Sequence, residues 1–293
     1  MLNHPKFKQI RHELQGNYHY FYQLCQSLYQ RYCPRCVTQR RNVAHVKIDD
    51  CRLLALLCLQ TTLGIQSQRR FWRLMTAFMP QKITISRSRF NRRALQLLPV
   101  VNAIRTGLTR EAAQPGQIAI IDSLPNPLCE PVRKFRARIF AGQANIGYNA
   151  TKQMSFYGFK THMLVTTDGY ILNYVVTAAS VHDTKVAVSL IDDCPCPIVL
   201  ADVGYVGKRL GAEFKQLGYT LWTPYRSNMK GGAKEHNKRA LKALRRTIES
   251  RFSTLVSDFE IETNLTRSAF GFQLKIELAI LVYNLGFFNF VTN

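Results

Sequence analysis

Apolar and aromatic residues recur every three or four positions along the first third of the chain. Over residues 6–32 the stripe consists of Phe7, Ile10, Leu14, Tyr18, Phe21, Leu24 and Leu28. This spacing places apolar side chains on one helix face and predicts one or two helices there. A second apolar helix is predicted over 53–63, where Asp49 and Asp50 supply the N-terminal cap. A third is predicted over 67–80.

The next predicted helix spans residues 85–98 and carries an arginine-rich face. Phe90, Ala94 and Leu97 fall on the face that would point inward. The face predicted to point outward holds Arg87, Arg89, Arg92 and Arg93. Short helices joined by brief turns, with the last one rich in arginine, are typical of a helix-turn-helix unit that enters the DNA major groove. A solvated basic face on a helical bundle is the alternative interpretation.

After residue 111 the pattern changes from helices to strands. One strand is predicted over 118–124, and an Asp-Gly turn joins two more over 156–166 and 170–178. The later elements are predicted as helix 185–193, strand 198–201, helix 208–217 and strand 219–224. A hairpin followed by alternating helices and strands predicts an α/β domain with a mixed sheet flanked by helices.

A last long helix is predicted from a further apolar stripe. Its members are Leu241, Leu244, Ile248, Phe252, Leu255 and Phe259. Their spacing is that of an amphipathic helix that packs on the sheet. Glu249 lies at the border of the stripe, so it can face the edge of the sheet.

A predicted loop over residues 129–153 separates the first strand from the hairpin. Its basic residues include Arg133, Lys134, Arg136 and Arg138. A loop of this length inside a compact domain usually has a function. We expect these side chains to hold phosphates, and solvated surface charge is the alternative.

Charge narrows the class of partner. The 293 residues include 40 Lys and Arg against 18 Asp and Glu, a formal net charge of +22. Residues 1–110 alone contain 19 basic and 3 acidic residues. Such an excess favours nucleic acid, because basic side chains neutralise phosphates and release counterions. A ribosome-associated or other RNA-binding protein would be basic too, so charge alone does not choose between them.

Other features of the composition argue against secretion and membrane insertion. The N-terminus lacks an apolar signal region. The apolar stretch 276–291 contains Glu277 and two asparagines, and is too short and too polar to cross a bilayer. Cys33 and Cys36 have metal-ligand spacing, but a second such pair is missing, so ordinary reduced thiols are favoured. We therefore expect a cytoplasmic protein with no membrane partner.

Three carboxylates stand where a metal site would need them. Asp122 and Asp202 each follow an apolar strand-forming run, and Glu249 lies on the basic last helix. Ends of neighbouring strands meet at one edge of a sheet, and carboxylates are suitable ligands for Mg²⁺. Two such ions can activate an attacking oxygen and stabilise a leaving one. Each acid alone has an ordinary explanation, namely a strand-end turn or a surface ion pair, and the role of Asp183 is left open.

Several segments together resemble a known family. They are Ile121-Asp122-Ser123-Leu124-Pro125, Tyr157-Gly158-Phe159-Lys160-Thr161-His162, Ala179-Ser180-Val181-His182-Asp183, Ala201-Asp202-Val203-Gly204-Tyr205 and Ile248-Glu249-Ser250-Arg251-Phe252-Ser253. In this order they resemble a bacterial insertion-sequence transposase of the DDE class, and most closely the insertion-sequence 982 family. The resemblance extends from about residue 47 to residue 285.

The resemblance implies a fold, a reaction and a set of partners. The fold is a ribonuclease H-like catalytic domain over 111–293, preceded by a helical DNA-binding domain over 1–110. Asp122, Asp202 and Glu249 would hold two Mg²⁺ ions, for which Mn²⁺ can substitute. The reaction is cleavage and joining of double-stranded DNA at the element's terminal repeats and at the target, by a homodimer.

Basic residues near the implied site would hold the DNA backbone. Arg245 and Arg246 precede Glu249 on the last helix, and with the 133–138 loop they would contact phosphates close to the reacting strand. A DDE-derived regulator that binds DNA without cutting it is the rival interpretation, and a basic RNA-binding protein is the other.

Overall fold

The structure, a computed structural model, describes the chain except residues 1–4, 42, 113–117, 150–151, 225–237 and 289–293. The chain divides into two compact units. The helical unit comprises Met1–Leu108, Asp258–Ile261 and Leu265–Asn293, and the sheet unit comprises Thr109–Ser257 and Glu262–Asn264. Each unit is described by itself below.

The helical unit contains the four helices that the first third of the sequence predicts. Its described helices are α1 (Pro5–Tyr32), α2 (Arg35–Thr38), α3 (Asp50–Thr62), α4 (Gln68–Phe78), α5 (Arg87–Gln96), α6 (Leu98–Ala112) and α10 (Ala269–Leu285), with single 3-10 turns at Val43–His45 and Pro80–Lys82. Asp49 caps α3 by accepting a hydrogen bond from the Arg52 amide, as its position predicts. Ser67 caps α4 in the same way through the Arg70 amide.

Helix α6 was not predicted from the sequence. It begins directly after α5, whose C-terminal cap is Leu97. Pro99 suggests the end of a helix, but it stands in the first turn of α6. Proline is tolerated there because the amide that it lacks would have no partner within the helix.

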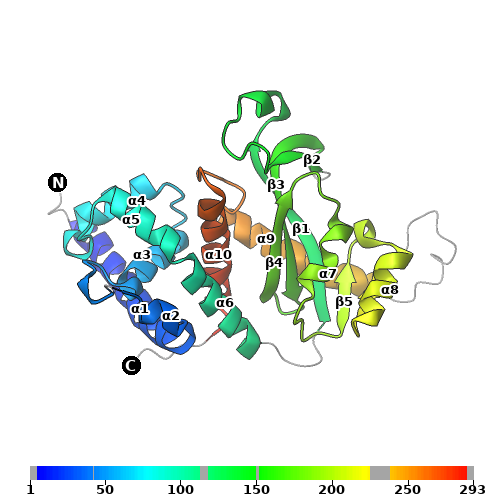
Figure 1. The fold of residues 1–293 in the computed structure, drawn as a ribbon, viewed down its shortest axis with the longest axis horizontal. Coiled ribbons are helices and arrows are strands. Elements are labelled where there is room, and N and C mark those ends of the chain that lie inside the picture. The colour runs from blue at the N-terminus through cyan, green and yellow to red at the C-terminus, as the bar shows by residue number, and fades with distance from the viewer. Residues whose placement is uncertain (1–4, 42, 113–117, 150–151, 225–237, 289–293) are drawn as a thin grey trace. The chain divides into compact units, whose positions relative to one another are not determined.

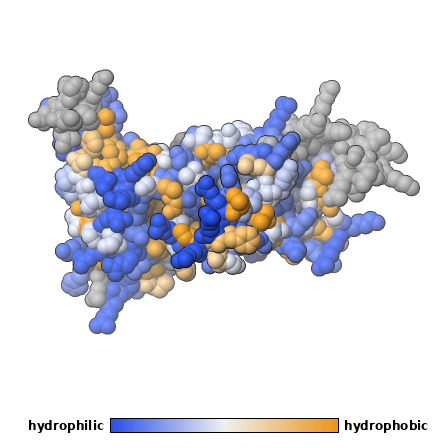
Figure 2. Space-filling view, turned by 90° about the horizontal axis from the view of Figure 1, so that it is seen from above, coloured by the Kyte–Doolittle hydropathy of each residue, from blue (hydrophilic) through white to orange (hydrophobic). Residues whose placement is uncertain are grey.

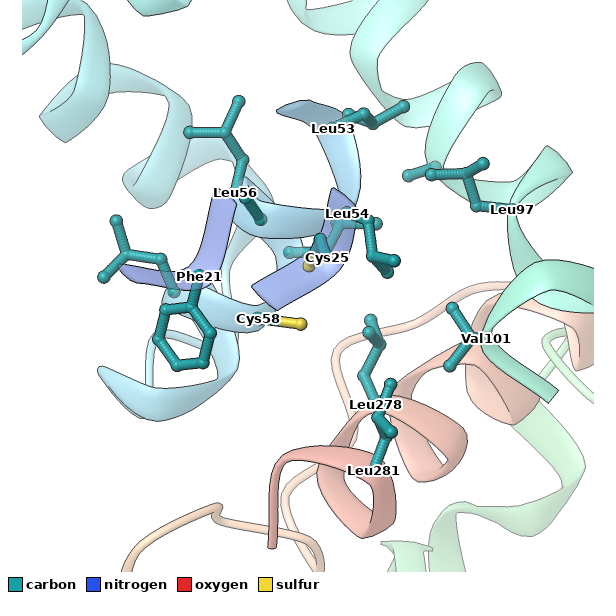
Figure 3. Close-up of a cluster of buried hydrophobic side chains, with 14 of the residues drawn as sticks. Phe21, Cys25, Leu53, Leu54, Leu56, Cys58, Leu97, Val101, Leu278 and Leu281 are labelled. Carbon is teal, nitrogen blue, oxygen red and sulfur yellow. The ribbon is translucent and has the colours of Figure 1, made fainter. Parts of the chain in front are cut away.

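Helix α10 packs in the helical unit, whereas the resemblance predicts one catalytic domain over residues 111–293. Leu278 and Leu281 point toward Leu97 and Val101 in the core (Figure 3). Almost every residue of α10 from Leu274 onward is buried, so the helix needs apolar neighbours all round. Glu277, only 1% exposed, is neutralised by Arg105 of α6 at 2.6 Å.

The sheet unit is built on one mixed sheet. Its strands are β1 (Ile118–Cys129), β2 (Asn145–Asn149), β3 (Met154–Thr166), β4 (Ile171–Ala178), β5 (Ile198–Ala201) and β6 (Thr220–Trp222). The spatial order is β2-β3-β1-β5-β6, with β4 also paired to β3 (Figure 1). Strand β1 is antiparallel to β3 and parallel to β5. This mixed α/β arrangement, flanked by helices, is consistent with a ribonuclease H-like domain.

Helices and turns accompany this sheet. They are α7 (Ala187–Leu190), α8 (Lys208–Gln216), α9 (Lys238–Ser257) and the 3-10 turns Pro131–Arg136, Asp183–Lys185 and Val203–Tyr205. The predicted hairpin is confirmed, and Gly169 in its turn has a φ of 99°, which favours glycine.

Two strand boundaries differ from the prediction. Strand β1 continues through Pro125 and Pro127 to Cys129, where Asn126 is fully buried and accepts a hydrogen bond from Thr161. Strand β2 lies within the region predicted as a loop, and it pairs with the start of β3. The helix predicted over 185–193 is shorter, because Asp183–Lys185 forms a 3-10 turn and α7 ends at Leu190.

Apolar side chains that remain on the surface are few and local. On the face shown in Figure 2, hydrophobic residues form separate patches among hydrophilic ones. The most exposed large apolar side chains are Phe135 at 92% and Val132 at 78%, both within the basic Pro131–Arg136 segment. None of the described helices is long and apolar enough to cross a membrane.

Candidate active site

Asp122 and Asp202 occupy matching positions on neighbouring parallel strands. Ile121 of β1 pairs with Ala201, the last residue of β5, and each aspartate is the next residue in the chain. In a parallel pair, residues at matching positions point to the same face of the sheet. Both side chains are partly exposed. The structure thus places two predicted ligands side by side in the middle of the sheet, at the end of β5.

Backbone amides orient both carboxylates. Asp122 Oδ1 accepts a hydrogen bond from the Ser123 amide at 2.8 Å, and Asp202 Oδ1 accepts one from the Val203 amide at 2.5 Å. Asp202 also begins the 3-10 turn Val203–Tyr205 as its N-terminal cap. Each carboxylate is therefore oriented by the residue that follows it, which restricts its rotation.

Tyr205 lies among three aspartates. Its side chain is 1% exposed, and its hydroxyl has no hydrogen-bond partner among the described residues. Burial raises the pKa of Tyr205, and the negative charges of Asp183, Asp122 and Asp202 raise this pKa further. The phenol therefore lies near Asp122, Asp202 and a third acid, Asp183, whose role the sequence left open.

Asp183 is held near this group by Lys160. Lys160 Nζ lies 2.5 Å from Asp183 Oδ1, and both side chains are largely buried. Asp183 also approaches the turn after Asp202, since a Cβ added to Gly204 would lie 3.7 Å from Asp183 Oδ2. Asp183 is thus a structural neighbour of the carboxylate pair, with its charge partly neutralised.

His162 is the neutral member of this polar cluster. Its ring is fully buried, with Nε2 2.9 Å from Thr177 Oγ1 and Nδ1 3.8 Å from Asp183 Oδ1. Burial lowers the pKa of His162 to about 4; Asp183 raises this pKa and Lys160 lowers it. The imidazole is neutral at neutral pH, so its contact with Asp183 is not an ion pair. Lys160, His162 and Tyr205 all lie in the motif segments quoted above, but nothing in the sequence gave them a role.

Glu249 lies on α9, which packs against β1. Ile248, Phe252 and Leu255 supply the buried face of the helix, and Glu249 is exposed next to Ile248. Arg251 ties the helix to the hairpin turn by donating a hydrogen bond to the Asp168 carbonyl at 3.2 Å. Among the described residues, no group of three His, Cys, Asp or Glu side chains is close enough to hold a metal ion. The complete triad stays a prediction.

The predicted basic contacts of the sheet unit are largely exposed. Arg133, Arg136 and Arg138 are exposed, while Lys134 is partly covered and lies 5.9 Å from the Phe135 ring. Arg246 is exposed on α9. The Arg245 side chain lies outside the described residues.

In the helical unit, one predicted DNA contact is wrong in its orientation. Arg87, Arg89 and Arg92 are exposed on α5, as expected. Arg93 instead turns inward and pairs with the buried Asp50 at 2.8 Å.

The Asp50 carboxylate accepts hydrogen bonds from several side chains. Arg40 approaches it at 2.6 and 2.8 Å, and Tyr29 donates at 2.9 Å. Burial alone would raise the pKa of Asp50, but hydrogen bonds from Arg40, Tyr29 and Arg93 hold that pKa below its ordinary value. A buried carboxylate needs such partners, and the helical pattern could not reveal that Arg93 is one of them.

Comparison with known families identifies the class of this protein. Residues 112–269, just over half of the chain, match the family described as transposase DDE domain. The chain belongs to this family, and the matched region contains Asp122, Asp202 and Glu249. Membership of the family implies DNA as a partner. A comparison with curated proteins found no match.

Proposed function

We propose that this protein is a DNA transposase that cuts and rejoins strands at the ends of a mobile element. The observation that carries the proposal is that Asp122 and Asp202 directly follow the paired residues Ile121 and Ala201 of two adjacent strands, in a domain of the transposase DDE family. Glu249, on the helix that packs against β1, is the proposed third acid. The finer assignment to the insertion-sequence 982 family is part of the proposal.

The donor set fits divalent ions. Carboxylate oxygens are hard ligands that suit Mg²⁺ or Mn²⁺, and the Ser123 and Val203 amides already fix the two aspartates. Two bound ions would supply positive charge at the scissile phosphate and lower the pKa of an attacking water. Asp122 and Asp202 would hold both ions, and Glu249 would complete the coordination of one of them.

Basic side chains of the sheet unit would keep the DNA in place. Arg246 is exposed on the same helix as Glu249, and Arg245 precedes it in the sequence. Arg133, Lys134, Arg136 and Arg138 form a second basic segment, which presents the exposed Phe135 to the partner as well. These residues would neutralise phosphates and add apolar contact, without being required for the chemistry.

The helical unit is proposed to bind the terminal repeats through α5, where Arg87, Arg89 and Arg92 are exposed.

Two element ends must be joined in concert, so we propose that the protein acts as a homodimer on DNA. To test this, the mass of the protein–DNA complex is measured with one labelled element end and with two. A complex that holds two ends but only one protein chain would contradict the proposal.

The decisive experiment measures strand cleavage. A labelled duplex carrying one end of the element that encodes the protein is incubated with Mg²⁺ or with EDTA. We expect cutting only with the metal, and its loss by Asp202→Ala and Asp122→Asn while binding is retained. Asp192→Ala removes an exposed acid of the same unit and serves as the matched control.

The outcomes separate the rival functions. Full activity of Asp122→Asn would refute the assignment of the site. Binding without cutting, even with both ends paired, would instead identify a DNA-binding regulator. A preference for RNA over DNA duplexes would indicate an RNA-binding protein.

A further inference from the structure

A pocket of about 510 Å³ opens in the helical unit, and none of its described lining residues belongs to the candidate active site. It lies between α3, α4, α5, α10 and the segment 258–268. Four basic side chains line it, namely Arg69 on α4, Arg87 on α5, Arg267 before α10 and Lys275 within α10. No aspartate or glutamate is among its described lining residues. The pocket is therefore strongly positive.

The three arginines of this pocket differ from the arginines of the unit that pair with buried acids. Arg69, Arg87 and Arg267 are exposed and form no ion pair with a described residue. In contrast, Arg93 and Arg105 are neutralised by the buried acids Asp50 and Glu277. The buried acids Asp50 and Glu277 are thus neutralised inside the unit, and because no acid is among the described lining residues, the charge at the pocket is available to an external anion.

Lys275 has a structural task at the same pocket. Its Nζ donates hydrogen bonds to the carbonyls of Glu260 at 3.1 Å and Ile261 at 3.0 Å. These bonds fasten the 258–261 segment to α10, and Gln66 on the opposite side donates to the Phe259 carbonyl at 2.8 Å. The pocket wall is therefore fixed from both sides, which suits a preformed binding surface.

The rest of the lining is mixed in character. Leu95 and Leu265 contribute apolar surface, and Leu265 is 60% exposed. Ser67 and Ser268, which cap α4 and α10, also line the pocket. The first turns of two helices add a weaker positive potential to that of the arginines.

We propose that this pocket binds the sugar–phosphate backbone of duplex DNA. The proposal rests on the function proposed above. It extends that function to a site whose lining residues come from two distant parts of the sequence, 57–95 and 259–279. Separate arginines match successive phosphates, and the exposed Leu265 matches the apolar face of a deoxyribose. Contacts to the backbone fix the position of the duplex without reading its sequence, which leaves Arg89 and Arg92 available for base edges.

Binding of a duplex of arbitrary sequence tests the proposal without any knowledge of the element. The full chain is titrated into a fluorescent DNA duplex in EDTA, over a series of salt concentrations. We expect Arg69→Gln and Arg267→Gln each to weaken binding about tenfold, and to reduce the salt slope by about 1. Arg70→Gln, next on the same helix and exposed but outside the pocket, is the matched control and should bind as the unchanged protein does.

The other outcomes overturn the proposal. If Arg70→Gln weakens binding as much as Arg69→Gln, the affinity comes from diffuse surface charge. Unchanged binding by a folded Arg69→Gln/Arg267→Gln double variant removes the pocket from the interface, and tighter binding of an RNA duplex excludes DNA as its partner. Because EDTA prevents cleavage, the binding assay is independent of the cleavage assay. If the pocket variants weaken binding but the protein does not cut DNA with Mg²⁺, only the proposed function is refuted. If the protein cuts DNA but the pocket variants bind normally, only the pocket proposal is refuted.

Discussion

Replacing Arg105 by methionine removes the cation that neutralises a buried carboxylate between α6 and α10. Arg105 Nε lies 2.6 Å from Glu277 Oε2, and the two side chains are 8% and 1% exposed. Removing one partner of a buried pair costs about 3–5 kcal/mol, because the other charge stays buried without compensation. Asn102 still donates to Glu277 at 2.6 Å. We therefore expect Arg105→Met to lower the free energy of unfolding by about 3 kcal/mol.

The double variant Arg105→Met/Glu277→Leu should recover much of this loss. Replacing both members of a buried ion pair by apolar residues of similar volume is often neutral or stabilising. Asn102 is exposed, so water can satisfy its amide after Glu277 is replaced. We expect the double variant to be more stable than Arg105→Met by at least about 2 kcal/mol.

Tryptophan fluorescence can follow this unit alone during urea unfolding. The chain has two tryptophans, and Trp222→Phe leaves Trp72, which packs against the helical core, as the reporter. Arg110→Met, an exposed change on α6, is the control and should shift stability by less than about 0.5 kcal/mol. A double variant as unstable as the sum of the single variants would refute the reasoning, since it would show that the two charges do not interact.

Three further predictions concern single polar groups. The pKa of His162 is about 4 in the folded protein, against an ordinary 6.5. The unfolded chain therefore binds a proton at a higher pH than the folded chain, and the free energy of unfolding should fall by up to about 3 kcal/mol between pH 6.5 and pH 4. The variant His162→Asn should show a flatter dependence of urea unfolding on pH. Asp50→Asn should lower the free energy of unfolding by about 3 kcal/mol at pH 7, and an unchanged urea midpoint at pH 7 would contradict this. In the unchanged protein, the stabilisation by Asp50 should be lost as the pH falls below about 3.8 and through the lower pKa of the folded state. Tyr205→Phe should leave the free energy of unfolding without metal unchanged or slightly raised, because the buried hydroxyl has no hydrogen-bond partner among the described residues. A decrease of more than about 1 kcal/mol would show that the hydroxyl does have a partner.

Local patterns in the sequence predicted most helices and strands. The spacing of Leu14, Tyr18 and Phe21 identified α1, and the Asp-Gly turn identified the β3–β4 hairpin. Failures occurred where local signals have two meanings. The helix predicted over 85–98 is two helices, α5 and α6, which meet at Leu97. Strand β2 is short and lies within a polar segment, and its pairing with β3 is a long-range interaction.

The sequence also located part of the candidate site. Two apolar runs that each end in an aspartate predicted Asp122 and Asp202 at strand ends. This is correct for Asp202, which follows β5, but wrong for Asp122, because β1 continues to Cys129; the pairing of β1 with β5 still brings the two residues next to each other. The approach of Asp183 and the burial of Tyr205 could not be predicted, because they depend on how the turns after β4 and β5 meet. The helix that carries Glu249 was predicted from its apolar stripe, whereas the approach of Glu249 to the two aspartates stays a prediction.

The sequence by itself determined the positive charge, the local elements and the order of the three acids, because charge, periodicity and turn chemistry act over a few neighbouring residues. Only the tertiary structure decided that α10 belongs to the helical unit, that Arg93 turns inward, and that Arg69 and Arg267 line one pocket. These outcomes depend on which surfaces are buried together. A buried carboxylate such as Asp50 or Glu277 attracts the cation that packing brings near it, wherever that cation lies in the sequence.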